Sequence, residues 1–401
     1  MNELKPSANC SANVNFVPMM SGVFSLPESG LRFVLKGTIL SGVFCLFTLV
    51  STAQFRKYSN EFLNIGAGAR GLSMGGAQVA TVTDGSAGYW NPSALANVRE
   101  NTQVNLMHAE YFAGIGKYDF ANVALPTRDG KRTLGVTALR FAVDDIMNTL
   151  FLVEPDGSIN YNNIKDFSSA DYAFLLSYAQ KVKQTNDGFI NFGVNAKIIH
   201  RSVGSFAKAW GFGLDAGIQI FKGQWRFGIV GRDITTTFNT WAFNFTEKEK
   251  EALYLTKNDI PVRSSEMTSP RLALGVGRSF RLSQKSNVLA EADFDVTFDG
   301  QRNTVISGDP VSIDPKIGLE YTYNDVFYVR GGIGNFQKAL ADGDTLNQKK
   351  VWIYQPSIGA GFKIKPVTID YAFVNLANQS NPLYTHVVSI KLDIARKRKA
   401  E

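Results

Sequence analysis

The chain has 401 residues, of which 44% are hydrophobic, 12% aromatic and 19% charged, and its net charge is +7. This composition is too apolar for a disordered chain and too polar on average for a bundle of membrane helices. Low charge with 36 glycines is typical of a large all-β protein with many turns, and Cys10 and Cys45 alone cannot build a disulfide scaffold or a cysteine zinc site.

An export signal is predicted at the N-terminus. A basic flank ending at Lys36 precedes a short apolar run, and small residues at Ser51 and Ala53 follow it. This order is the pattern of a secretory signal peptide, and the run is shorter than the ~20 residues that a membrane-spanning helix needs. We therefore expect residues 1–53 to be an N-terminal extension and signal peptide that is cleaved before Gln54.

A glycine-rich segment, residues 54–100, follows the expected signal. Gly66, Gly68 and Gly71 spell the pattern G-x-G-x-x-G, but no β-α-β alternation follows, so the pattern does not indicate a dinucleotide site. Glycines also allow close backbone packing, and we expect a short plug or hatch here. If Arg70 is buried it needs a partner, for which Asp84 is the candidate. The predicted structural residues of this segment are Gly66, Gly68, Arg70, Gly71, Gly75, Gly76, Asp84, Asn91 and Pro92.

From residue 101 to residue 395, apolar and polar residues alternate with a period of two in about fourteen successive segments. In residues 189–199, for example, Ile190 and Phe192 flank Asn191. Segments of ~10 residues that alternate in this way and are separated by turns are typical of a transmembrane β-barrel. A soluble β-sandwich also alternates, so the alternation alone does not decide between the two.

Loop lengths distinguish the two architectures. Joining the strands in order places short turns on one side, at 127–132, 182–188, 221–224, 281–286, 324–325 and 365–366. The other side carries longer connections at 143–167, 233–268, 299–311, 335–352 and 378–384, with short exceptions near 113–116 and 203–205. Short turns at one rim and long loops at the other are typical of an outer-membrane barrel. We expect a 14-stranded antiparallel barrel over residues 101–395 and a basic periplasmic tail at 396–401.

The alternation also assigns faces to the strands. The apolar sets are expected to face lipid, with aromatic girdles that include Trp210, Trp225, Tyr321, Tyr323 and Phe327. The cations expected in the lumen are Lys197, Arg226, Arg232, Arg271, Lys316, Arg330, Lys363 and Lys391. The anions expected there are Asp215, Glu291, Asp293, Asp295, Asp314, Glu320, Asp370 and Asp393. Such a balanced set favours a cross-linked, filled interior that is closed to ions over a porin constriction of one charge sign.

Two stretches stand out from the regular pattern. In residues 233–268, Thr246 is expected to cap a short helix, and aromatic residues of the kind enriched in interfaces surround it. They indicate either contacts to another protein or a loop that covers the barrel mouth; the candidates are Trp241, Phe243, Phe245 and Tyr254. In residues 139–145 the alternation breaks, which indicates either a sideways opening in the wall or a bulge at the rim.

The head and the tail of the chain resemble a known family. Residues 62–77 read FLNIGAGARGLSMGGA, residues 89–95 read YWNPSAL, and the end carries IDYAF at 369–373 and THVVS at 385–389. These segments resemble the PorV/PorQ family of Bacteroidota outer-membrane proteins, with the head in the form of its broader members rather than of PorV proper. The Asn91-Pro92-Ser93 element is similar to the Asn-Pro-Ala motif of FadL-type fatty-acid transporters. The resemblance implies a FadL-like barrel in the outer membrane.

Two functions from different classes are then expected. The resemblance implies a non-enzymatic partner or accessory in type IX secretion, which handles secreted cargo or other surface proteins. The alternative is a FadL-like transporter of hydrophobic small molecules, with the glycine-rich head as its hatch. An enzyme is not expected, because His108, His200 and His386 lie far apart and no nucleophile motif accompanies them. No cofactor or metal site is expected, outer-membrane lipid is the expected surrounding, and no basic stripe points to nucleic acid.

Overall fold

The computed structural model describes residues 54–55, 58–154, 156–261, 263–340, 349–374 and 384–395. The expected signal peptide at 1–53 and the expected basic tail at 396–401 lie outside the described residues. In the described part, none of the helices has the length and apolar character needed to cross a membrane.

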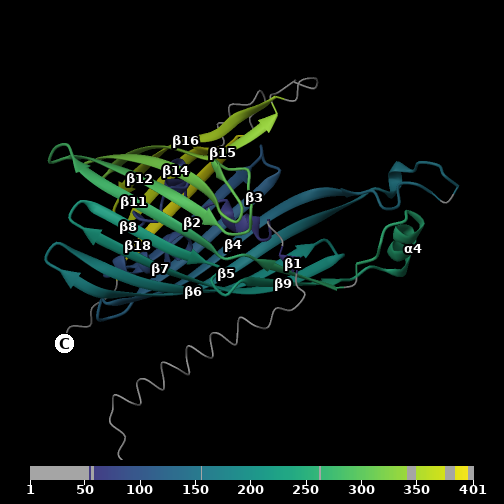
Figure 1. The fold of residues 1–401 in the computed structure, drawn as a ribbon, viewed down its shortest axis with the longest axis horizontal. Coiled ribbons are helices and arrows are strands. Elements are labelled where there is room, and N and C mark those ends of the chain that lie inside the picture. The colour runs from purple at the N-terminus through teal and green to yellow at the C-terminus, as the bar shows by residue number, and fades with distance from the viewer. Residues whose placement is uncertain are drawn as a thin grey trace, which may run out of the picture. The chain divides into compact units, whose positions relative to one another are not determined.

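Antiparallel strands make up most of the described chain (Figure 1). They are β2 (Thr102–Tyr111), β3 (Gly116–Pro126), β4 (Arg132–Asn148), β5 (Lys165–Thr185), β6 (Gly188–Val203), β7 (Ala207–Lys222), β8 (Trp225–Arg232), β9 (Thr237–Phe243), β10 (Arg263–Thr268), β11 (Arg271–Arg281), β12 (Ser286–Thr297), β14 (Ser312–Tyr323), β15 (Phe327–Leu340), β16 (Lys350–Ile364), β17 (Val367–Val374) and β18 (Thr385–Ile394). The short strands β1 (Gln54–Phe55) and β13 (Ile306–Ser307) pair with β10 and β14.

These strands close into a barrel. β8 and β9 both pair with β7, so they form one wall strand that is interrupted at residues 233–236. β11 and β10 pair with β8 and β9 in the same way, with an interruption at 269–270. β18 pairs with β2 from His386↔Glu110 to Ile394↔Thr102 and closes the ring. In the described residues the wall is therefore a closed 14-stranded antiparallel barrel, as the alternation predicted.

The alternation places side chains on the two faces of the wall as expected. On β6, Phe192 is 39% exposed on the outer surface, whereas Asn191 beside it is fully buried. The predicted lipid-facing aromatics, among them Trp210 and Phe327, are also exposed on the outside. Because successive side chains of a strand point to opposite faces, the residues that alternate with these outward-facing apolar ones are directed into the lumen.

Several predicted loop boundaries were wrong. Residues 233–268 contain the strands β9 and β10, and the connection itself spans only 244–262. The connection predicted at 143–167 spans 149–164, because β4 and β5 extend past the rim. The break predicted at 139–145 is a bulge between Val143 and Ile146, with Asp145 at φ 56°, and the ladder with β5 resumes beyond it. The bulge alternative therefore holds at this site, and the sideways opening of the ladder does not. Of the connection expected at 378–384, only Tyr384 is described.

The connections at the long-loop rim contain short helices. The β4–β5 connection contains η3 (Tyr161–Asn163), and the β9–β10 connection contains α4 (Glu247–Leu255). Figure 1 shows the β4–β5 connection and α4 at the same end of the barrel. The cap predicted at Thr246 is present, because Thr246 and Glu249 form a reciprocal capping box at the start of α4.

The head lies inside the barrel. It is built from η1 (Glu61–Asn64), α2 (Ala69–Ser73), α3 (Ala87–Trp90) and η2 (Pro92–Asn97). α2 contacts β15 to β18 on one side of the lumen, and η2 contacts β4 to β7 on the other. Its apolar side chains, including Trp90 and Leu95, form one hydrophobic core with inward-facing residues of the wall. The lumen is therefore filled by chain from both the head and the strands.

Candidate functional site

Close packing explains three of the predicted glycines in the head, Gly66, Gly71 and Gly75. Gly75 has φ +67°, and a Cβ added there would lie 2.5 Å from the backbone nitrogen of Ile333. A Cβ at Gly71 would lie 2.6 Å from the ring of Trp90. The other predicted glycines, which all have positive φ, are Gly66, Gly68 and Gly76. Gly66 and Gly71 of the pattern that resembles a dinucleotide fingerprint therefore pack against Trp90 within the head, whereas Gly75 packs against the wall.

Asn91 and Pro92 shape the start of η2. The Asn91 Oδ1 accepts a hydrogen bond from the backbone N–H of Ser93 at 3.2 Å, and its Nδ2 donates to the carbonyl of Val79 at 2.9 Å. Pro92 lies directly against Gly193, where an added Cβ would come within 2.5 Å of the proline carbonyl carbon. This element thus ties two parts of the head to each other and to strand β6.

The partner predicted for Arg70 was wrong. Arg70 Nε donates to Glu320 at 2.8 Å, and its Nη1 donates to Gln78 at 2.9 Å. Arg330 donates to the same carboxylate of Glu320 at 2.6 Å and binds Asp370, also at 2.6 Å. Glu320 thus lies between two arginines, because inward positions on β14 and β15 meet α2 here. Sequence separation hides such a pairing, since the residues are 250 positions apart.

Asp84 has different partners. Its carboxylate accepts hydrogen bonds from Ser86 and lies 3.9 Å from the Lys391 ammonium. Burial alone would raise the pKa of Asp84, but Lys391 and the hydrogen bonds from Ser86 lower it below its usual value. Asp84 therefore links the head to β18 through Lys391, and it is not the direct ion-pair partner of Arg70.

Two carboxylates of β12 hold the middle of the head. Asp293 accepts hydrogen bonds from the backbone N–H groups of Gln78 and Val79 at 2.7 and 2.9 Å. Glu291 accepts from those of Ala80 and Thr81 at 2.7 and 3.1 Å. Buried backbone N–H groups must be paired, and this short non-helical stretch finds its acceptors on the wall. Both carboxylates are thus used for attachment of the head.

The other predicted lumen charges also face inward. Lys197 lies 2.8 Å from Asp215 and also binds Asp233, which falls within the loop predicted at 233–268. Lys316 binds Asp295 at 2.5 Å, and Arg232 donates to the carbonyl of Trp90 at 3.3 Å. On β16, the half-buried Lys363 stands between outward-facing Phe362 and Ile364. The lumen is therefore cross-linked by charges of both signs, as their balance had suggested.

The aromatic residues predicted as loop contacts do not form one exposed surface. Trp241 is only 9% exposed, because it lies on the inward face of β9 and packs on Ala207 and Ala209. Phe243 packs against this cluster, and Phe245 stacks on Phe243 with ring centroids 6.4 Å apart. Tyr254 on α4 is 78% exposed. The first three therefore close the lumen rim, and Tyr254 alone of the four is clearly available to a partner.

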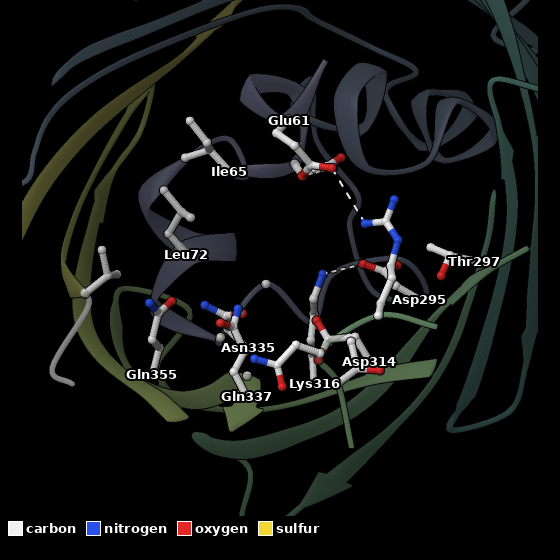
Figure 2. A pocket seen from close by; sticks show the side chains of 18 of the residues that line it. Glu61, Ile65, Leu72, Asp295, Thr297, Asp314, Lys316, Asn335, Gln337 and Gln355 are labelled. Atoms are coloured by element: carbon white, nitrogen blue, oxygen red, sulfur yellow. Dashed lines mark hydrogen bonds and ion pairs between the residues drawn. The ribbon is translucent and has the colours of Figure 1, made fainter. Parts of the chain in front are cut away.

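A cavity of about 670 Å³ lies in the lumen next to the head (Figure 2). It is on the side of the long loops, because it reaches the loop-side ends of β2, β12, β14 and β17. Its apolar lining comprises Ile65, Leu72, Trp90, Tyr111, Phe112 and Val374. Its polar lining includes Arg271, Asp295, Asp314, Lys316, Asn335, Gln337 and Gln355. The cavity is thus amphipathic, and its volume lies within the about 300–1,000 Å³ typical of small-molecule sites.

No pattern in the sequence indicates this cavity. Alternation placed Arg271, Asp295 and Lys316 in the lumen, but nothing in the sequence brings them opposite the head residues Ile65 and Leu72. Across the described ranges, no cluster of three or more histidine, cysteine or acidic side chains is arranged to hold a metal ion. The chemistry that the cavity offers is therefore hydrogen bonding, charge and apolar contact.

Several solved structures of channels and transporters share this fold. Neither a protein-family profile nor a curated protein matches the sequence. The CymD monoaromatic hydrocarbon channel aligns with a TM-score of 0.50 and 13% identity over 83% of this chain and 99% of its own. The toluene transporter TodX of Pseudomonas putida aligns with a TM-score of 0.50 and 14% identity over 82% of this chain and 98% of its own. A FadL homologue of Pseudomonas aeruginosa aligns with a TM-score of 0.46 and 13% identity over 82% of this chain and 98% of its own. At this level of identity, the similarity shows a common FadL-like fold.

Proposed function

We propose that this protein is an outer-membrane channel for a hydrophobic small molecule and that the lumen cavity is its binding site. The amphipathic cavity carries this proposal, because a 670 Å³ space with one apolar wall is suited to a small molecule rather than to a folded protein domain. The barrel fold and its channel-type neighbours support an outer-membrane location and a non-enzymatic role. The hydrocarbon ligands named for those neighbours support the chemical class proposed for this chain.

Passage through the barrel requires the head to move. Trp90 and Leu72 of the head form part of the cavity wall, and the segment from Gln78 to Asn97 fills the lumen towards the periplasmic side. A ligand bound in the cavity touches the head directly, so its binding energy can act on the contacts that hold the head in place. The channel is therefore proposed to be closed at rest.

Participation in type IX secretion is a second proposal, supported by the resemblance of residues 62–77 and 89–95 to the PorV/PorQ family. The exposed Tyr254 on α4 offers a contact for a partner. This proposal has less support, because Trp241, Phe243 and Phe245 are used at the rim of the lumen. Native pull-down from outer membranes, with mass spectrometry of proteins and lipids, tests it: recovery of secretion components with the wild type but not with Tyr254→Ala would favour this role.

Uptake of a labelled hydrophobic compound tests the channel proposal. Ile65→Trp fills the cavity from the head side, whereas Ile159→Trp introduces the same residue at a position that is 60% exposed on the β4–β5 connection. We expect cells with the wild-type protein or Ile159→Trp to take up labelled toluene or octane faster than cells without the protein. Ile65→Trp should abolish this gain at equal barrel abundance. Equal uptake with Ile65→Trp and with the wild type would contradict the proposal.

A further inference from the structure

The charges on the cavity wall balance. Three cations line it, Arg271, Arg302 and Lys316, together with three anions, Glu61, Asp295 and Asp314. Lys316 is neutralised by Asp295 at 2.5 Å, and Arg302 by Asp299 at 2.6 Å. Figure 2 shows the Lys316–Asp295 pair beside the cavity. A carboxylate or phosphate ligand would add negative charge to a site with no surplus of positive charge.

A cluster of amide side chains forms the neighbouring part of the wall. Gln337 donates to Asn335, and both point to the cavity together with Gln355 on the adjacent strand β16 (Figure 2). A bulge in β15 between Gly334 and Gln337 builds this cluster, with Asn335 at φ 52°. Bulges redirect side chains, and here the bulge brings two amides to one face. Gln355 is only partly buried where it lines the cavity.

Two other residues that line the cavity, Arg271 and Asp314, have buried polar atoms without a partner. In the described chain, the buried Nε of Arg271 has no hydrogen-bond acceptor, and the buried Oδ1 of Asp314 has no donor. The residue nearest to Arg271 Nε with opposite charge is Asp233, at 4.0 Å. A hydroxyl group both donates and accepts, and amides do the same, so hydroxyls match a wall that presents donors and acceptors side by side. A purely apolar ligand would cover the amides of Asn335, Gln337 and Gln355 without pairing them, which costs free energy.

The opposite wall is apolar. Ile65 and Leu72 from the head face the polar cluster across the cavity in Figure 2, and Trp90, Phe112 and Val374 also line it. We propose that the cavity takes an amphiphile with an alkyl or aryl tail and an uncharged polar end that carries several hydroxyl groups, such as a glycoside. This inference rests on the proposed channel function and specifies the class of its ligand.

Ligands that share an alkyl chain and differ in their polar end test the proposed ligand class. Octyl glucoside, sodium octanoate and octane, each radiolabelled, are to be titrated against the protein in lipid nanodiscs, with empty nanodiscs as the blank. Octyl glucoside should bind roughly tenfold more tightly than octanoate, because octanoate adds charge and lacks the hydroxyls. Octanoate or octane binding as tightly as octyl glucoside would overturn the inference and leave the channel proposal standing. Absence of binding by all the compounds would contradict both.

Replacement of a single amide side chain tests whether the polar end and the tail of the ligand are bound separately. Gln355→Leu removes one amide from the cavity, and Gln184→Leu makes the same change at an exposed position near the β5–β6 turn. Gln355→Leu should weaken octyl glucoside binding roughly tenfold and leave octane binding unchanged, whereas Gln184→Leu should change neither. Equal melting temperatures of the two variants would show that folding is not the cause. Unchanged octyl glucoside affinity in folded Gln355→Leu would overturn the inference.

Discussion

Individual lumen residues could be predicted by face but not by partner. The period of two placed Lys197, Glu291 and Glu320 inside, because one side of every barrel strand faces the lumen. The same pattern holds no information on which residue from the head meets them. The sequence therefore predicts the nearby Asp84 as the partner of Arg70, whereas the structure pairs Arg70 with Glu320, 250 positions away. Contacts of this kind arise only when the barrel closes around the head.

Removal of the Glu320 charge should destabilise the barrel strongly. Glu320→Gln leaves Arg70 and Arg330 with one carboxylate fewer in a buried site, and breaking a buried ion pair costs about 3 kcal/mol or more. The melting temperature in detergent measures the loss. Glu247→Gln, which removes an exposed ion pair with Lys250 on α4, is the control and should have little effect. Similar melting temperatures for both variants would contradict the role of Glu320.

The head glycines permit a test that separates backbone strain from steric contact. Gly68 and Gly75 both have positive φ, a backbone conformation that an alanine adopts only with strain. At Gly68 an added Cβ meets no atom within 4 Å, whereas at Gly75 it lies 2.5 Å from the backbone of Ile333. Gly75→Ala should therefore lower the melting temperature clearly more than Gly68→Ala. If Gly68→Ala is equally harmful, close packing of the head at β15 is not the cause.

At the scale of elements, strands with regular alternation were predicted well and interrupted strands were not. Residues 233–236 contain Asp233 and Thr236 at positive φ, so the alternation stops in the middle of the wall strand that β8 and β9 form. Sequence patterns do not distinguish such an interruption from the start of a loop. For this reason the sequence predicts a loop where β9 and β10 lie, with Trp241 as a partner contact or part of a cover over the barrel mouth, whereas Trp241 faces the lumen.

The helix α4 was predicted from local signals, and its cap can be tested locally. Thr246→Ala removes both hydrogen bonds between the Thr246 hydroxyl and Glu249, which should cost about 1 kcal/mol of helix stability. Hydrogen exchange of residues 247–255 should become faster while the melting temperature of the barrel stays the same. Thr256→Ala at the C-terminal end of the helix is the control and should have a smaller effect. Unchanged exchange in Thr246→Ala would show that the capping box does not hold α4.

At the scale of the whole molecule, barrel closure and strand number followed from the sequence, but the cavity did not. Its walls come from the head, from β2 and from the strands between β11 and β17, which meet only because β18 pairs with β2. The balanced charges did predict a filled interior. The amphipathic cavity next to the head depends on how far the head extends into the barrel, and no local sequence pattern encodes this depth.

Conductance in planar bilayers tests the filled interior. The wild-type protein should show no stable, large open conductance, because the head and the paired charges fill the lumen. Deletion of residues 60–98 should create an open channel in barrels that still assemble, as judged by heat-modifiable migration on gels. A large wild-type conductance would contradict the closed lumen. A silent deletion variant would show that the charged side chains of the wall fill the pore without the head.

The most direct test of the central claim is the position of a bound hydrophobic molecule. Crystals soaked with bromooctane allow the bromine to be located by anomalous diffraction. We predict a bromine peak in the lumen cavity, beside Leu72, Trp90 and Phe112, and its loss in Ile65→Trp. Bromine found only on the outer, lipid-facing surface of the barrel, with none in the cavity, would contradict the account.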